Sequence, residues 1–547
     1  MNTLTTTVDT LAHATTTSST RASTAWRDLA WLLGLALLLR LVFFNGVFGS
    51  DDGVYFWRAL NVARGEWTSS NYNGALRYGF NLPAGALVAV FGASPFAANL
   101  WPLLCSLGEI ALVYLAAVEL WGRRAGVCAA LVLSSMPLHI AVATRLHADP
   151  VVSMFVTLGF VLFLFACRRR RAGLFFCCGL AIGGVFWAKE LAAITWFAFL
   201  FLPLVGRRLP MIGRRWDPLW WYVIAGATLM LLLNFLLMQA ITGDPLHLVK
   251  VVLGALSRNF IDGGQGEDAA NYYLRYLFFD MRHTWIAAVL ACAGIAVLYR
   301  RQAADGRQAD GFYVVVWLLG LLAVLSVFPV SLWPLRLTMK QSNYLTLFIA
   351  PLALLAGYFI ASLPRRAAAT MLALAVAGGT LLGVLQQADY RVFTANSKSA
   401  TVFAHAHPTA VVVGSTNNSN MSYYYDKTPP HVLSFSEVLA QPRLVAPADG
   451  SRDGLYAVFD AQTIDWMPRE ARLTAPLPCW TKQQRLQPEG LGLGNALAGW
   501  AATAAAGLPE PLGRLSPPLQ RLARPRPADV YRVEGPDLWC GTRPGAK

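Results

Sequence analysis

The stretch FNGVFGSDDGVYFWRALNVARGEW (residues 44–67) directly follows an apolar run of membrane length. It presents two adjacent carboxylates, Asp51 and Asp52, and then a segment rich in aromatic residues. The segment starts with good N-cap residues and ends at Gly65, so the plainest interpretation is a capped helix that lies in the membrane interface. Capping needs only one carboxylate, which leaves the other for chemistry.

The composition of the chain indicates a membrane protein. Its 547 residues are 56% hydrophobic and 14% charged, and the mean hydropathy is +0.45. The net charge of +15 does not indicate nucleic-acid binding, because the arginines come in short clusters between apolar segments. Residues 1–28 are rich in Thr and Ser and lack the apolar core of a signal peptide, so we expect a disordered cytoplasmic leader.

Eleven segments are apolar and approach the length that a bilayer core requires. We therefore predict a mainly α fold, with a polytopic transmembrane helical domain over 29–387 and a small α/β domain over 388–547. The candidate spans lie at 29–48, 97–119, 126–144, 150–167, 173–188, 191–206, 219–241, 284–299, 312–328, 343–362 and 368–386.

Basic clusters set the expected orientation, because they occur in every second connection between spans. They are GRR (122–124), RRRR (168–171), GRRLPMIGRRW (206–216), YRRQAADGR (299–307) and PRR (364–366). The positive-inside rule places these loops and the N-terminus in the cytoplasm. An odd number of spans then places the C-terminal domain outside, together with 49–96, 144–149, 188–190, 242–283 and 328–343.

Two charges fall within predicted spans, Arg40 and Glu109. Each lies roughly 17 Å from the cytoplasmic end of its helix at the α-helical rise per residue. A lone charge at that depth costs about 2.5–3.5 kcal/mol on insertion scales. We therefore expect the two residues to form a structural ion pair.

The other ionisable candidates gather in the outward connections. TRLHADP (144–150) carries Arg145, His147 and Asp149. Asp149 and Pro150 suit the first positions of the following helix, which is the structural alternative to a functional role. His147 and a carboxylate are also suitable ligands for a divalent cation, although no spacing here demands a metal.

Two further outward connections carry lysine. Lys189 and Glu190 separate two apolar runs. They form either a simple turn, whose lysine extends to the lipid headgroups, or a site in which the lysine binds a lipid phosphate. Arg336 and Lys340 precede a span, where they suit interfacial anchoring or an anion site. A weaker signal for anion or sugar contacts comes from the end of the 242–283 loop, at Tyr272, Tyr273, Arg275 and Arg282.

Carboxylates and cations together at a lipid boundary suit transfer of a sugar from a polyprenyl phosphate. A base takes the proton of the acceptor hydroxyl, and cations stabilise the departing phosphate as its charge develops. A transporter or flippase is the first alternative, but it would keep ionisable groups at the bilayer midplane and often show inverted repeats. A non-catalytic scaffold for envelope assembly has no need of such a set.

At these residues the sequence resembles the GT-C class of integral-membrane glycosyltransferases. It is most similar to the group that contains the protein O-mannosyltransferases and the lipid A aminoarabinose transferases (glycosyltransferase family 39), and to related lipopolysaccharide-core transferases. The family's arginine in the first span matches Arg40, and its D-E-x-x-Y matches DDGVY (51–55), with Asp for Glu. The family's proline-bearing juxtamembrane helix is RYGFNLPAGALVAVFG (77–92) here, without the usual preceding His.

Three further motifs follow in the family's order over roughly 29–360. S-R-x-x-x-x-D matches TRLHAD with one residue fewer, K-E matches Lys189-Glu190, and K-x-x-x-Y-L matches Lys340 to Leu345. The resemblance implies Asp51 as the base, Asp52 as the second choice, and Asp149 as another catalytic acid. It implies donor-phosphate contacts from Lys189, Arg145, Lys340 and Arg336, and substrate contacts from Tyr55, Glu190 and His147.

The resemblance also implies partners and a location. The donor would be a polyprenyl-phosphate-linked sugar, and the acceptor a glycolipid such as lipid A or lipopolysaccharide, another envelope glycan, or a protein. Transfer would proceed with inversion on the periplasmic face of a bacterial inner membrane. No cofactor is required with certainty, a divalent cation remains open, and no nucleic acid is expected.

The C-terminal part has a mixed composition that predicts short strands at 410–415, 431–435, 455–460 and 529–533. No element is predicted over 488–527, which is rich in Gly, Ala and Pro. Six of the eight cysteines lie in or beside apolar segments. The other two, Cys479 and Cys540, are able to pair if this domain lies outside the cytoplasm.

Overall fold

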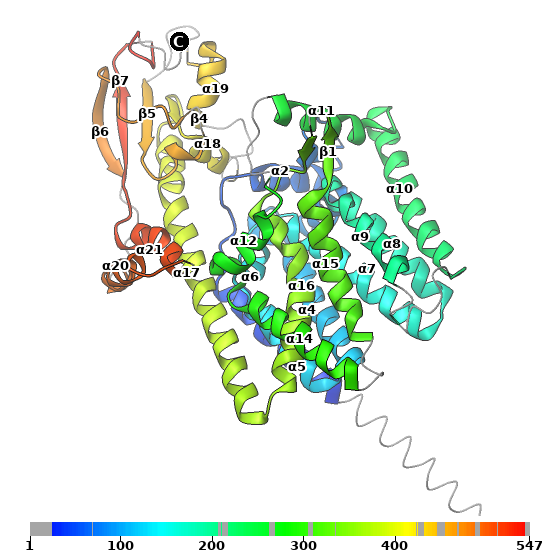
Figure 1. The fold of residues 1–547 in the computed structure, drawn as a ribbon. Coiled ribbons are helices and arrows are strands. Elements are labelled where there is room, and N and C mark those ends of the chain that lie inside the picture. Colours follow the sequence, from blue (N-terminus) through cyan, green and yellow to red (C-terminus); the bar gives the residue numbers. More distant parts are fainter. Residues whose placement is uncertain are drawn as a thin grey trace, which may run out of the picture. The chain divides into compact units, whose positions relative to one another are not determined.

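The computed structural model is mainly helical and separates into two compact units (Figure 1). The first unit comprises Met1–Phe43, Leu103–Ile140 and Ala148–Leu381, and the second comprises Phe44–Pro102, Ala141–His147 and Leu382–Lys547. Most of the predicted leader, residues 1–23, lies outside the described residues. The structure describes 24–67, 69–205, 209, 217–261, 269–304, 310–333, 335–422, 424, 432–445, 454–467, 470–486, 493–510, 512–535 and 537–541.

Every predicted span contains helix. Residues 24–42 are helical, and the later spans correspond to Pro95–Trp121 (α4), Arg123–Ser135 (α5) with Pro137–Ala143 (α6), Asp149–Arg169 (α7), Ala172–Ala188 (α8), Trp196–Val205 (α9), Trp220–Thr242 (α10), Ala287–Ala304 (α14), Phe312–Val327 (α15), Thr346–Ser362 (α16) and Arg365–Ala406 (α17). Within the described residues, five helices are long and apolar enough to cross a membrane alone, or six if α5 and α6 count as one bent span. Several of the eleven predicted spans are thus shorter than a single straight crossing.

Two of these shorter spans have a local cause in the sequence. The α5–α6 pair bends by 61° at Pro137, which has no N–H to continue the helical hydrogen bonds. In the 191–206 span, Lys189 and Glu190 interrupt the apolar run. The chain there forms a 3₁₀ helix, Glu190–Thr195 (η2), before the ten-residue α9 begins.

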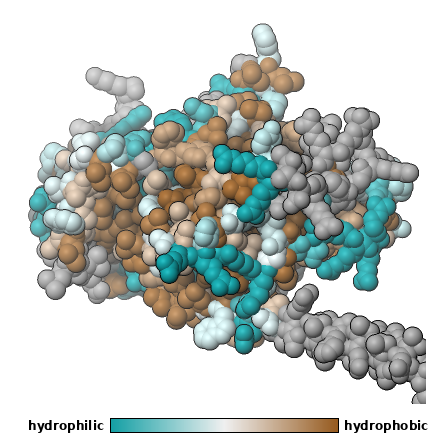
Figure 2. Space-filling model, turned by 60° about the horizontal axis from the view of Figure 1, so that its bottom comes forward, coloured by the Kyte–Doolittle hydropathy of each residue, from teal (hydrophilic) through white to brown (hydrophobic). Residues whose placement is uncertain are grey.

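Helix α16 forms the centre of the first unit. In the span Ser342–Ser362, 83% of the 18 most apolar consecutive residues are buried, whereas the corresponding share in α10 is 17%. Helix α16 packs on α5, α7, α14 and α15. The outer helix α10 instead exposes large apolar side chains such as Trp221 and Leu236, and Figure 2 shows apolar side chains over much of the face drawn. An apolar outer surface is what lipid contact requires.

Glycines set the closest helix contacts in the first unit. Gly179 of α8 and Gly226 of α10 face each other's helices, and a Cβ on either would overlap backbone atoms of the other helix. Gly357 of α16 has the same relation to Ala129 of α5. Small residues at such positions let helices approach closely in a membrane, where lipid tails compete equally for apolar side chains.

The second unit is built around a five-stranded sheet. Its strands are Val411–Gly414 (β3), Val432–Ser434 (β4), Leu455–Asp460 (β5), Trp480–Leu486 (β6) and Ala528–Val533 (β7), in the order β4-β3-β5-β7-β6. Strand β3 is parallel to β4 and β5, whereas β7 is antiparallel to β5 and β6. All four predicted strands are present, and β6 is an addition that the polar sequence WTKQQRL did not indicate.

Each face of this sheet has its own core. One face packs on the C-terminal part of α17 through Ala400, Phe403 and Ala404. The other buries an aromatic cluster that contains Phe435, Trp480, Tyr531 and Trp539. Beside this cluster Cys479 forms a disulfide with Cys540.

The segment 488–527, for which no element was predicted, contains a helical pair. The helices Leu493–Ala506 (α20) and Ser516–Ala523 (α21) pack on α17 around Val392. Figure 1 shows the pair beside α17, at the left. The same unit contains Asp52–Ala63 (α2) and Tyr78–Phe91 (α3), the two helices expected beside the membrane. They pack so closely that a Cβ at Gly85 of α3 would meet Val62 of α2 at 2.6 Å.

Candidate functional site

Asp52 has a structural task that its neighbour does not share. Its side chain is 3% exposed and turns back onto the loop that precedes α2. Oδ2 accepts hydrogen bonds from the backbone N–H groups of Phe48 at 2.5 Å and Gly49 at 3.2 Å, and Oδ1 accepts one from Ser50 at 2.5 Å. This carboxylate therefore fixes the loop by satisfying three backbone donors, which a lone N-cap bond would not do.

Asp51 is exposed at the N-cap of α2, where its side chain makes no capping hydrogen bond. The Tyr72 phenol lies beside it. Partial burial raises the pKa of Tyr72, and Asp51 raises it further through its negative charge and through the hydrogen bond that it accepts from the phenol. Of the two adjacent carboxylates, one is thus consumed by the backbone and the other is exposed beside a protonated phenol.

Tyr55 and Arg77 are buried next to this acidic pair and contact each other. Tyr55 is 1% exposed, and its hydroxyl accepts a hydrogen bond from Nη1 of the buried Arg77. The ring of Phe80 packs on Tyr55 with centroids 4.8 Å apart. Because Arg77 and Phe80 come from the start of α3, the proline-bearing segment 77–92 supplies a cation where the family's pattern suggested a preceding histidine.

The C-terminal part of the second unit supports the same loop. Asn417, on the helix Thr416–Ser422 (α18), donates from Nδ2 to the carbonyl oxygens of Phe48 at 3.0 Å and Gly49 at 3.1 Å, and Asn420 donates to Gly49 at 3.2 Å. The phenol of Tyr424 lies near Asp52; burial, and then the charge of this carboxylate, raise its pKa.

Arg145 belongs to this loop arrangement as well. Its guanidinium lies over the rings of Phe48 at 5.0 Å and Tyr390 at 4.5 Å, and its Nε donates to the Ala141 carbonyl at 3.3 Å. Backbone hydrogen bonds also join Gly46 to Thr144 and Leu146. The cation is therefore oriented by aromatic faces and remains half-buried, as does His147.

A second group of predicted residues meets in the first unit. Asp149, 1% exposed, accepts a hydrogen bond from Lys189 Nζ at 2.9 Å on Oδ1 and one from Asn343 Nδ2 at 3.0 Å on Oδ2. Lys189 Nζ also lies 4.4 Å from the ring centroid of Tyr344. Asp149 occupies the first position of α7 and Ala148 is the N-cap, so the ion pair, and not helix capping, uses this carboxylate.

The other predicted site residues of the first unit differ in exposure. Lys340 is 1% exposed and donates to the Thr338 carbonyl at 3.2 Å, and Glu190 is buried beside Lys189 in the sequence. Arg336 is exposed on Leu335–Leu337 (β2), which pairs with Pro329–Leu332 (β1) as a hairpin. Arg282, a weaker candidate, is held by Asp280 in a two-point ion pair.

The predicted site residues thus form two groups, one in each unit. Asp51, Asp52, Tyr55, Arg145 and His147 belong to the second unit, and Asp149, Lys189, Glu190, Arg336 and Lys340 belong to the first. A single site that unites them stays a prediction. Among the described residues no group of three or more His, Cys, Asp or Glu side chains is placed to hold a metal ion.

The expected direct ion pair between Arg40 and Glu109 was wrong in detail, because His139 stands between them. Arg40 Nη2 lies 2.7 Å from His139 Nδ1, and His139 Nε2 lies 3.3 Å from Glu109 Oε2. Glu109 Oε1 also accepts hydrogen bonds from Ser153 at 2.7 Å and Thr157 at 2.8 Å. A lone histidine in the apolar run PLHIAVA was the sequence signal for this buried network.

Several residues that the sequence analysis did not select hold these groups together. Arg77, Tyr72 and Asn417 do so in the second unit, and Asn343 and Tyr344 in the first. Tyr344 lies inside the K-x-x-x-Y-L motif, and Arg77 begins the juxtamembrane segment, so both had a signal. Asn417 lies far along the sequence from the loop that it contacts and had none.

The comparisons with known proteins bear on the fold and the family resemblance. Residues 81–242 match the family model of dolichyl-phosphate-mannose-protein mannosyltransferases. No curated protein matches the chain in sequence.

Solved structures share the fold at low sequence identity. ArnT from Cupriavidus metallidurans bound to undecaprenyl phosphate has a TM-score of 0.55 at 17% identity, covering 79% of this chain and 93% of its own. The apo form of an Archaeoglobus fulgidus oligosaccharyltransferase has 0.52 at 13%, covering 84% and 73%. The same organism's oligosaccharyltransferase AglB, in complex with an inhibitory peptide and a dolichol-phosphate, has 0.50 at 12%, covering 94% and 89%. The resemblance to the GT-C glycosyltransferases is confirmed, and the chain has the fold of a multi-pass membrane protein of that class.

Proposed function

We propose that this protein transfers a sugar from a polyprenyl-phosphate donor to an acceptor hydroxyl of a glycolipid, an envelope glycan or a protein. The transfer takes place on the periplasmic face of a bacterial inner membrane. The observation that carries the proposal is the division of tasks within the acidic pair. Asp52 is buried on three backbone amides, whereas Asp51 is exposed with no capping bond.

In this proposal Asp51 is the general base. Its carboxylate takes the proton of the acceptor hydroxyl while the acceptor oxygen forms a bond to C1 of the sugar. The bond between C1 and the phosphate oxygen breaks, and its electron pair leaves with the polyprenyl phosphate. Attack from the face opposite the leaving group inverts the configuration at C1. A positioned base of this kind contributes about 10²–10⁴-fold to the rate.

Lys189 is the proposed ligand of the departing phosphate, with Arg145, Lys340 and Arg336 as further cations and Asp149 as the carboxylate that holds Lys189 in place. The buried Asp149–Lys189 pair supports this assignment. A buried ammonium loses little side-chain freedom on binding, and charge-assisted hydrogen bonds to phosphate are strong. Tyr55, Glu190 and His147 are the proposed substrate contacts.

Product analysis by mass spectrometry tests the proposal. Purified protein is incubated with polyprenyl-phosphate sugars and with candidate glycolipid, glycan and peptide acceptors. We expect the wild type and the variant Glu66→Gln, which changes an exposed acid just past α2, to form a covalent product at similar rates, and Asp51→Asn to form it about 10²–10⁴-fold more slowly. A transporter would move labelled substrate in proteoliposomes without forming a covalent product. That result would overturn the proposed transfer in favour of transport.

A further inference from the structure

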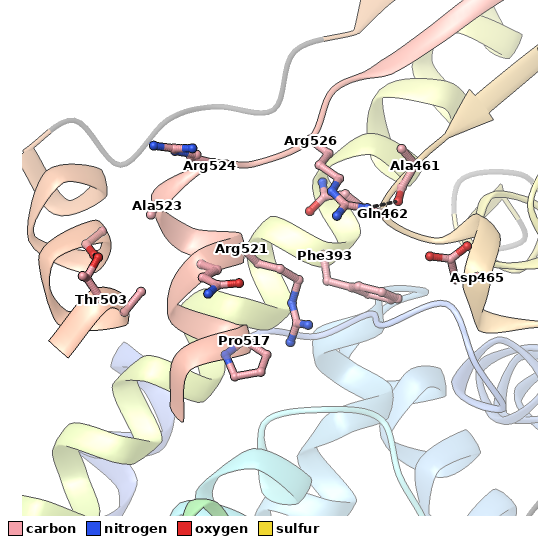
Figure 3. A pocket seen from close by; sticks show the side chains of 13 residues that line it. Phe393, Ala461, Gln462, Asp465, Thr503, Pro517, Arg521, Ala523, Arg524 and Arg526 are labelled. Carbon is pink, nitrogen blue, oxygen red and sulfur yellow. Dashed lines mark hydrogen bonds between the residues drawn. The ribbon is translucent and has the colours of Figure 1, made fainter. Parts of the chain in front are cut away.

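The second unit contains a cavity of about 830 Å³ that the sequence analysis did not foresee. Its walls are α17, the turn after β5, the helical pair α20–α21, and the segment that leads into β7 (Figure 3). None of the proposed transfer residues lines it. The volume falls within the range of small-molecule sites, roughly 300–1,000 Å³.

Positive charge dominates the lining of this cavity. Among the described residues that line it, three are arginines and one is acidic. They are Arg521, Arg524, Arg526 and Asp465. Asp389 neutralises Arg521 through two hydrogen bonds of 2.7 and 2.6 Å.

The other two arginines are not neutralised in this way. Within the described part of the chain, Arg524 and Arg526 make no ion pair, and the guanidinium of Arg526 donates a single long hydrogen bond, to the Ala461 carbonyl at 3.4 Å. Two exposed guanidiniums in one cavity are suited to an anion with several oxygen acceptors, above all a phosphate.

The backbone presents these two arginines at low entropic cost. They alternate with prolines in the sequence Arg524-Pro525-Arg526-Pro527. Proline fixes its own φ and keeps the preceding residue extended. The segment is therefore already ordered before a ligand binds.

The remaining lining suits a sugar. Figure 3 shows Phe393, Gln462 and Arg521 gathered at the centre of the cavity, with Thr503 and Asp465 on opposite sides. Gln462 Oε1 is buried and has no hydrogen-bond partner among the described residues, so it offers an acceptor for a hydroxyl. Phe393 stacks on Phe48 with centroids 5.3 Å apart and offers its other face to the C–H groups of a pyranose ring.

We propose that this cavity binds a saccharide that carries a phosphate group, through Arg524 and Arg526 for the phosphate and Gln462 and Phe393 for the sugar. Leu497 and Trp500 are 69% and 75% exposed on α20, which favours a lipid-borne over a free phosphosaccharide. In the proposed function this ligand is the acceptor. That one assignment rests on the proposed function, whereas binding itself does not.

Calorimetric titration of the full-length protein in phosphatidylcholine nanodiscs tests the site. We expect glucose 1-phosphate to bind, glucose to bind at least about tenfold more weakly, and the double variant Arg524→Gln/Arg526→Gln to lose about tenfold or more in affinity for glucose 1-phosphate. Arg514→Gln is the matched control, because Arg514 lies between the same two helices, pairs with Glu510 and does not line the cavity.

Two further arms complete the experiment. In the first arm, the protein is reconstituted in nanodiscs that also contain phosphatidylinositol 4-phosphate. If the ligand is lipid-borne, this lipid should compete and weaken the binding of glucose 1-phosphate; if the ligand is free, the affinity for glucose 1-phosphate should not change. Equal affinity of the wild type and the double variant for glucose 1-phosphate, at equal thermal stability, overturns the proposal. The titration requires no transfer, so a failed transfer assay with normal binding removes only the acceptor assignment.

Discussion

Replacing each member of the acidic pair by asparagine should separate chemistry from structure. Asp51→Asn and Asp52→Asn are the same substitution at adjacent positions, so differences between them reflect the environment alone. Asp51 is exposed and makes no capping bond. Asp52 is buried and accepts three backbone hydrogen bonds.

The magnitudes follow from these contacts. An asparagine at 52 keeps one acceptor oxygen, and its NH₂ group faces at least one backbone N–H. If the asparagine NH₂ group takes the place of Oδ1, only the Ser50 N–H loses its acceptor. If the NH₂ group takes the place of Oδ2, the N–H groups of Phe48 and Gly49 both lose theirs. Losing one hydrogen bond to a charged group costs about 1.5–3 kcal/mol. At 51 we expect a change in stability within about 0.5 kcal/mol, because the side chain is exposed and an asparagine oxygen still accepts the hydrogen bond of the Tyr72 phenol.

Two measurements on each variant are sufficient. Thermal unfolding of the purified protein should show a lowered midpoint for Asp52→Asn and an unchanged one for Asp51→Asn. Transfer assays well below the unfolding midpoint should show turnover reduced about 10²–10⁴-fold by Asp51→Asn, and a smaller loss for Asp52→Asn. The reasoning is refuted if Asp51→Asn turns over normally, or if it unfolds as early as Asp52→Asn.

Three further outcomes are expected from the same contacts. Reducing the Cys479–Cys540 disulfide, which closes a loop of 61 residues, should destabilise the C-terminal domain by about 4 kcal/mol in the chain-entropy model. The change in tryptophan fluorescence on unfolding should then come at a lower temperature with reductant, and an unchanged midpoint would contradict this. Arg40→Met removes the guanidinium that contacts His139 and balances the buried charge of Glu109 through it, and should destabilise the first unit by about 3–5 kcal/mol. Adding Glu109→Gln removes the unbalanced charge and should restore most of the loss; a double variant no more stable than the single one would count against the network. Partial burial raises the pKa of Asp529, but the basic side chains of β6 lower it by more, so the pKa lies below its usual 3.8. The stability it adds should therefore be present above about pH 3.8 and lost as the pH falls further, and the acid unfolding curve of Asp529→Asn should lack this component.

The positions of the apolar helices were largely predictable from the sequence. Long apolar runs identified the helices, because burial of apolar side chains over membrane length is a local property of composition. The same runs did not give their geometry. The bend at Pro137 and the short α9 depend on local breaks, and how many helices cross the membrane alone depends on packing.

The acidic pair shows where sequence reasoning ended. Two adjacent aspartates were enough to identify a candidate base, but not to distinguish their tasks. That distinction comes from the fold of residues 48–50, whose N–H groups converge on Asp52. Asn417, more than 350 positions along the chain, holds the same loop in place.

The sequence by itself thus determined which segments are apolar, where charge interrupts them, and which short motifs resemble a transferase. Only the tertiary structure decided which of these charges are consumed by the protein and which remain for a ligand. Three backbone amides bind Asp52, His139 joins Arg40 to Glu109, and Arg524 and Arg526 line a cavity. The physical reason is that hydrogen bonding and ion pairing depend on distance in space, and distance is set by packing between segments that the order of residues along the chain does not specify.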